Sequence, residues 1–154
     1  MTLSLSVAAD FIYPEAFQRY SEHIPEEERN DYLAAYYKRV TSDDPEVQKK
    51  AALEWTLWEG ACSRLVNSKE FVSKYEEEKF ALAFARIETH YFFHGAFFPS
   101  DDYLVRKENI DKIRHIPTVI VQGRYDIGKW FYLIFKSHIQ RILTTVCLFF
   151  SLSH

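Results

Sequence analysis

Glycine is scarce in this sequence, with only Gly60, Gly95, Gly123 and Gly128 among 154 residues. None of them belongs to a G-x-S-x-G turn, the strand-to-helix turn that exposes a catalytic serine. No stretch is rich enough in proline, glycine or serine to be a flexible linker, and no internal repeat is present. These absences exclude a repeat protein, and they exclude a serine nucleophile of that type within these residues.

Cysteine is equally scarce. Cys62 and Cys147 are too few for a disulfide framework, and neither has the C-x-x-C or H-x-x-H neighbours of a zinc site. The first ten residues, MTLSLSVAAD, lack the cationic start and the long apolar run of a secretory signal. We therefore expect a reduced, cytoplasmic chain with no metal and no cofactor.

Charge is modest overall but unevenly placed. The formal net charge is -3 and the pI about 6.1, which provides no basic field for phosphates, so we expect no nucleic acid partner. All 22 acidic residues lie within 1–126, whereas residues 127–154 carry only basic charges. The uncharged runs of this tail are shorter than the roughly 20 residues that span a bilayer, so no membrane is expected.

Most of the chain has a helical pattern. Helices are predicted from Pro25 through the apolar stripe that ends at Val40, from Asp43 to Leu65, and from Glu78 to Gly95. Pro14 fits the first turn of an earlier helix, residues 1–11 are expected to be irregular, and residues 96–103 to be loop.

The pattern changes at Thr118–Gln122, a β-branched run between Pro117 and Gly123 that predicts a buried parallel strand. A single parallel strand needs partner strands, which must come from elsewhere or be missing. The tail from Trp130 to Leu152 is apolar and aromatic without a clear period.

Two carboxylates stand among aromatic residues. Glu59 follows Trp58 on the second predicted helix, and Glu88 shares a helix face with Phe92 and other aromatics. Such a pair suits a ligand with a cationic nitrogen and an apolar ring. A paired acid-base role is one competing interpretation. Exposed acids on the helix surface, with Glu88 paired to Arg86 or Lys79, are another, and spacing alone favours this one.

Asp126 closes the segment Gly123–Asp126 directly after the predicted strand. Catalytic groups of open α/β sheets gather at the carboxyl ends of strands, so Asp126 is a candidate for the acid of a catalytic triad. An aspartate that caps a loop turn is an equally good interpretation.

Four segments resemble the proline iminopeptidases of the α/β-hydrolase superfamily in order and spacing. They are IYPEAFQRYSEHIPEEER, LAAYYKRVTSDDPEVQKKAALEWTLWEG, FALAFARIETHYFFHGAFF and IRHIPTVIVQGRYD, and they cover about 12–126. The resemblance implies a serine peptidase that releases N-terminal proline from peptides, with a helical cap inserted between the strands of the sheet.

The resemblance also implies roles for individual residues. Glu59 and Glu88 would hold the α-imino nitrogen of the substrate, Phe92 would line the proline pocket, and Asp126 would orient the catalytic histidine. The family has asparagine at the position of Thr89. The fold expected is mainly α: an irregular start over 1–11, a cap over 12–116, one core strand with its acid loop over 117–126, and an unrelated tail over 127–154.

Other parts of the family pattern are missing from these residues. The sequence contains neither the HGGPG oxyanion loop nor the GGSWG nucleophile turn, and the resemblance stops after Asp126, with no histidine in the expected Gly-His context. A truncated or altered gene product would explain both ends. We expect this chain by itself to be inactive. The alternative is a non-catalytic helical module that binds a peptide N-terminus or a protein partner, and an interfacial role for the tail is a weaker third possibility.

Overall fold

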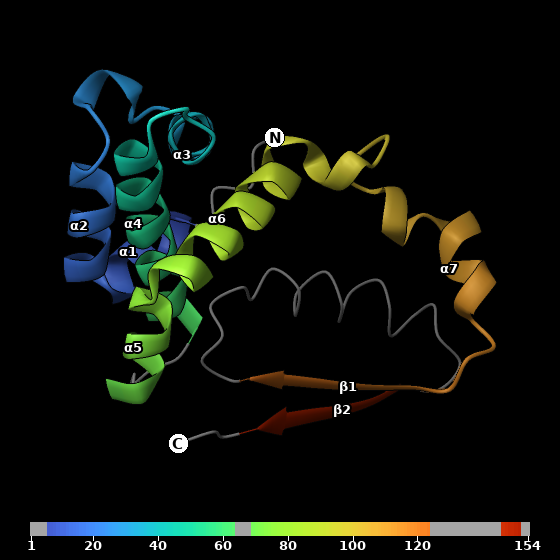
Figure 1. The fold of residues 1–154 in the computed structure, drawn as a ribbon. Coiled ribbons are helices and arrows are strands. Elements are labelled where there is room, and N and C mark those ends of the chain that lie inside the picture. Colours follow the sequence, from blue (N-terminus) through green and yellow to red (C-terminus); the bar gives the residue numbers. More distant parts are fainter. Residues whose placement is uncertain (1–5, 64–68, 124–145, 152–154) are drawn as a thin grey trace. The chain divides into compact units, whose positions relative to one another are not determined.

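The structure is a computed structural model that describes residues 6–63, 69–123 and 146–151. It divides into two compact units, residues 1–97 and residues 98–154, which are described separately. Figure 1 shows the helices of the first unit and the helix and two strands of the second. Among the described helices, none is both long and apolar enough to cross a bilayer.

The first unit is helical. Helix α4 lies at its centre and packs against α2, α3, α5 and α6. The elements are α1 (Ser6–Ile12), α2 (Pro14–Glu22), the short 3-10 helix η1 (Glu26–Glu28), α3 (Tyr32–Val40), α4 (Pro45–Ser63), α5 (Lys69–Glu76), α6 (Glu78–Phe93) and the 3-10 helix η2 (Gly95–Phe97).

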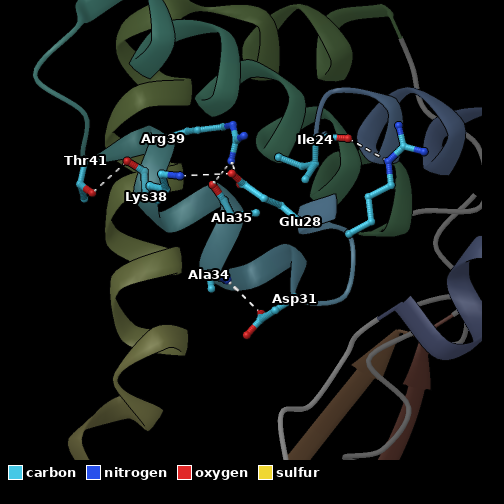
Figure 2. A network of polar contacts seen from close by, with 9 residues as sticks. Ile24, Glu28, Asp31, Ala34, Ala35, Lys38, Arg39 and Thr41 are labelled. Carbon is cyan, nitrogen blue, oxygen red and sulfur yellow. Dashed lines mark hydrogen bonds and ion pairs between the residues drawn. The ribbon is translucent and has the colours of Figure 1, made fainter. Parts of the chain in front are cut away.

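The helix predicted to begin at Pro25 begins later. Asp31 is its N-cap and accepts a hydrogen bond from the backbone N–H of Ala34 at 3.0 Å, so α3 starts at Tyr32. The acids after Pro25 form only η1, because Glu28 is held by α3 itself: Arg39 donates to Glu28 at 2.6 Å and Lys38 at 3.1 Å (Figure 2). This pairing lowers the pKa of Glu28.

Helices α4 and α6 follow the predicted ranges closely. The cap of α4 is the side chain of Asp44, which accepts from the N–H of Glu46 at 2.9 Å, rather than that of Asp43. Helix α6 ends at Phe93, and Gly95 follows with φ +56°, as expected of a residue that terminates a helix. Ala96 and Phe97 also have positive φ, at 52° and 61°, so the loop starts with an unusual left-handed turn.

Aromatic rings fill the centre of the first unit. Tyr20 stacks on Tyr36 with ring centroids 4.6 Å apart and on Trp58 at 5.4 Å. The Tyr36 hydroxyl donates to the backbone oxygen of Tyr20 at 2.7 Å, which satisfies the polar tip of a ring that is 0% exposed. Arg19 of α2 joins Glu54 of α4 through two hydrogen bonds, at 2.5 and 2.8 Å. These contacts fix the position of α4 relative to α2 and α3.

The second unit contains the 3-10 helix η3 (Tyr103–Val105), α7 (Lys107–Ile113), β1 (Thr118–Gly123) and β2 (Val146–Ser151). Strand β1 lies where the sequence predicted a strand. It pairs in parallel with β2, from Thr118 opposite Val146 to Gly123 opposite Ser151. The partner strand thus comes from the tail, in which no regular element was predicted.

The structure contains helices that were not individually predicted from the sequence. Residues 6–12 are helical, whereas residues 1–11 were expected to be irregular. Helices α5 and α7 were not predicted. The 12–116 segment also contributes to both compact units, because the division falls after Phe97. Its assignment as a cap remains a prediction.

Gly60 of α4 allows α5 to approach closely. A Cβ at this position would lie 2.9 Å from Cδ1 of Tyr75 and 3.2 Å from two further ring carbons. The Tyr75 ring cannot easily move away, because it packs edge-on against Phe80 at 5.4 Å and against Phe84 at 6.1 Å. Glycine is therefore required here by the neighbouring ring, although α4 is helical throughout.

Replacing Gly60 by alanine should destabilise the first unit. Alanine gains about 1 kcal/mol of helix propensity, but overpacking against the ring costs about 1–3 kcal/mol. In a Tyr75→Ala background the clash is gone, so the same substitution should stabilise instead. Urea unfolding of the four variants of this cycle, followed by circular dichroism, checks the reversal of sign. Equal effects of Gly60→Ala in both backgrounds would show that the Tyr75 ring does not require glycine here.

Candidate functional site

Glu88 is held by a neighbouring helix. It lies on α6 and is half-buried, and its Oε2 accepts a hydrogen bond from the indole Nε1–H of Trp55 on α4 at 2.7 Å. Burial raises the pKa of Glu88 above its ordinary value, while the hydrogen bond from Trp55 acts in the opposite direction. The site therefore holds a carboxylate whose charge is only partly compensated by the protein.

Trp55 is the residue that organises this site. It is 4% exposed, and its ring lies 5.4 Å from Tyr36 and 6.1 Å from Tyr20, so the aromatic core fixes its orientation. Its ring also lies 6.4 Å from the ring of Phe92, which is 41% exposed. The indole thus links a carboxylate and an accessible aromatic ring that are one turn apart on α6.

Glu59 lies on α4, four residues after Trp55, so both side chains project from one face of the helix. It is half-buried. Its charge acts on neighbouring groups. The pKa of the Cys62 thiol is raised to about 12, mainly by burial of the thiol and secondly by the negative charge of Glu59. The same two causes raise the pKa of Tyr20.

The structure describes three of the four predicted site residues. It places Glu88 and Phe92 around Trp55, and it places Glu59 one helical turn away along α4. The hydrogen-bond partner of Glu88 is an indole, whereas the competing interpretation paired this residue with Arg86 or Lys79. Asp126 lies outside the described residues, and its role stays a prediction.

The sequence did not identify Trp55 as a site residue. Its position one helical turn before Glu59 is the signal that could have identified it. Among the residues that the structure describes, no group of three or more His, Cys, Asp or Glu side chains is arranged to hold a metal ion.

Comparisons with known proteins agree with the resemblance seen in the sequence. The chain is 52% identical over 119 residues to a probable proline iminopeptidase of Leptolyngbya boryana, a match that covers 77% of this chain and 36% of the relative. It is 54% identical over 117 residues to a proline iminopeptidase of Arabidopsis thaliana, covering 75% and 30%, and 47% identical over 119 residues to one of Xylella fastidiosa, covering 77% and 37%. No family model matches the chain.

The match thus includes most of this chain but only part of each relative. The chain spans about a third of the length of the curated relatives that it matches. Over the matched stretch, the chain is homologous to curated proteins that are named proline iminopeptidase or probable proline iminopeptidase.

The raised pKa of Glu88 predicts a stability difference that grows with pH. The folded chain holds the Glu88 proton more tightly than the unfolded chain, whose ordinary pKa is 4.5. The contribution of this group is therefore complete below about pH 4.5 and is lost as pH rises through the folded pKa. Relative to the natural chain, Glu88→Gln should gain stability as the pH rises above about 4.5, and the gain should level off above the folded pKa of Glu88.

Urea unfolding at a series of pH values measures this difference. The matched control is Glu46→Gln, which removes an exposed carboxylate from the first turn of α4. A difference between the natural chain and Glu88→Gln that stays constant over the whole pH range would show that Glu88 is not desolvated.

Proposed function

We propose that this chain carries the substrate-recognition part of a proline iminopeptidase and recognises the N-terminal proline of a peptide. The observation that carries the proposal is the half-buried carboxylate of Glu88, held by Trp55 beside the exposed ring of Phe92. The names of the relatives support it, since each of those compared is a proline iminopeptidase, one of them named as probable.

The chemistry of an N-terminal proline fits these groups. Its nitrogen is a secondary ammonium with two N–H donors, and its side chain is a closed apolar ring. Trp55 donates to Oε2 of Glu88, and a carboxylate has further acceptor positions that can receive a cationic donor. A cation beside Glu88 offsets the cost of burying this carboxylate, so binding and desolvation reinforce each other.

Glu59 supplies the second acid of the proposed site. Its position one turn from Trp55 puts it on the face of α4 that carries the indole. Two carboxylates can each accept one N–H of the ammonium, and the exposed ring of Phe92 forms an apolar wall for the pyrrolidine. The selectivity for proline follows from the combination, because a primary amine lacks the ring and an acylated proline lacks the charge.

Catalysis needs groups that these residues do not include. The sequence has no G-x-S-x-G turn and no HGGPG loop, so an attacking serine and its oxyanion donors have no counterpart in residues 1–154. In this proposal Asp126 is the triad acid after β1, and the chain alone binds its ligand without cleaving it. The proposal places the chain in the cytoplasm and includes no cofactor.

A second candidate function rests on the exposed aromatic rings near the end of α6. Tyr91 is 51% exposed, Phe93 47% and Phe97 61%. Exposed apolar surface of this kind favours association with a protein partner. In that case the aromatic rings, rather than the carboxylates, would determine binding.

The two functions differ in how binding depends on charge. Titration calorimetry with a prolyl-alanine amide should show binding that is weakened about tenfold or more by Glu88→Gln and by Glu59→Gln, because each removes a charged hydrogen-bond acceptor. The N-acetylated peptide, which has no ammonium, should bind weakly or not at all. Glu46→Gln is the charge-matched control, and circular dichroism verifies that each variant is folded.

Binding that survives both substitutions, or equal binding of the acetylated peptide, would contradict recognition through the carboxylates. Either result would favour the protein-partner function instead.

A further inference from the structure

Two histidines meet at one hydroxyl on the opposite side of α6 from Glu88. The Tyr37 hydroxyl lies 3.1 Å from Nδ1 of His90 and 3.3 Å from Nε2 of His94. A hydroxyl has one hydrogen, so it donates to one of these nitrogens and accepts from the other. Both imidazoles are therefore aimed at the same point in space.

The spacing of the two histidines brings their rings together. His90 and His94 are four residues apart on α6, and their ring centroids are 4.6 Å apart. Two histidines at this spacing on one helix face are a recurrent arrangement for binding zinc. His90 also lies about 200° around the helix from Glu88, since each residue advances about 100°, so this face is separate from the proposed peptide site.

Neighbouring rings fix the orientation of the cluster. Phe97 stacks on His94 with centroids 5.3 Å apart and an interplanar angle of 13°, and Phe93 stacks on Tyr37 at 4.4 Å and 18°. Phe97 reaches His94 because the left-handed turn at Gly95–Phe97 folds the chain back, with φ 61° at Phe97 itself. A non-glycine residue adopts this conformation only at an energetic cost. Here the strained backbone places the Phe97 ring against His94.

The end of a helix is also a favourable place for a cation. His94 is the C-cap of α6 and His90 lies in its last turn, where the carbonyl ends of the helix dipole attract positive charge. Among the described residues, no third histidine, cysteine or carboxylate joins this pair in a metal-binding group. An ion here would be completed by water and would exchange readily.

We propose that His90 and His94 form a two-histidine site for a divalent ion of the zinc class at the end of α6. The ion binds Nδ1 of His90 and Nε2 of His94, at the roughly 2.0–2.1 Å of zinc–imidazole bonds. Without metal, the Tyr37 hydroxyl occupies the meeting point and holds both rings in place. On binding, the hydroxyl gives up this position, and the imidazole that donated to it moves its proton to the other ring nitrogen.

Titration calorimetry of the untagged chain with zinc chloride tests the site. His90→Gln and His94→Gln should each weaken the tightest zinc binding at least tenfold, because glutamine can still bond to Tyr37 but replaces an imidazole ligand. The matched control is His115→Gln, which removes an exposed histidine of the second unit and should leave this binding unchanged. Zinc binding that is the same in all three variants, or absent from the natural chain, would overturn the proposal.

A measurement on the natural chain does not depend on the folding of any variant. Ring-nitrogen NMR should show that zinc shifts Nδ1 of His90 and Nε2 of His94 before the nitrogens of His23 and His115. Zinc that shifts other histidines and leaves these two unchanged would also overturn the proposal.

Discussion

The contact between Trp55 and Glu88 joins the two helices on which the proposed function depends. A carboxylate in this half-buried position needs a donor, and the indole N–H provides one at 2.7 Å. The indole is in turn fixed by Tyr20 and Tyr36, so the aromatic core sets the position of a charged group near the surface. The rings around Trp55 include a buried one and an exposed one, because Trp55 lies 5.4 Å from Tyr36 and 6.4 Å from Phe92.

Helix α4 carries this arrangement because its neighbours pack on it from several directions. Arg19 ties α2 to it through Glu54, and Gly60 allows the Tyr75 ring of α5 to lie against its backbone. Helix α6 uses two faces for two kinds of polar cluster. Glu88 turns toward α4, while His90 turns toward α3 and Tyr37. In the proposals made above, the helical unit thus separates a site for an organic cation from a site for a metal ion.

The sequence predicted those helix bounds that are determined by interactions between residues close together in the chain. The helix predicted from Asp43 to Leu65 corresponds to α4, and Gly95 marked the end of α6. The helix expected from Pro25 was wrong because Glu28 pairs with Arg39 and Asp31 caps α3, a choice that the string of acids does not reveal. The hydrogen-bond partner of Glu88 could not be predicted either, because Trp55 is 33 residues away in the sequence and lies on another helix. Spacing along α6 alone suggested only nearby cations. Strand β2 was missed because its pairing with β1, rather than its own period, defines it.

In the proposed function, recognition and catalysis are separate, because residues 1–154 contain groups suited to an N-terminal proline but no G-x-S-x-G turn. Hydrolysis of proline p-nitroanilide by the folded, purified chain tests this separation most directly. We expect no release of nitroaniline above the buffer rate, because neither a nucleophile nor an oxyanion site is provided. Release that disappears in Asp126→Ala would contradict the separation, since a complete catalytic triad would then have to be assembled from these residues.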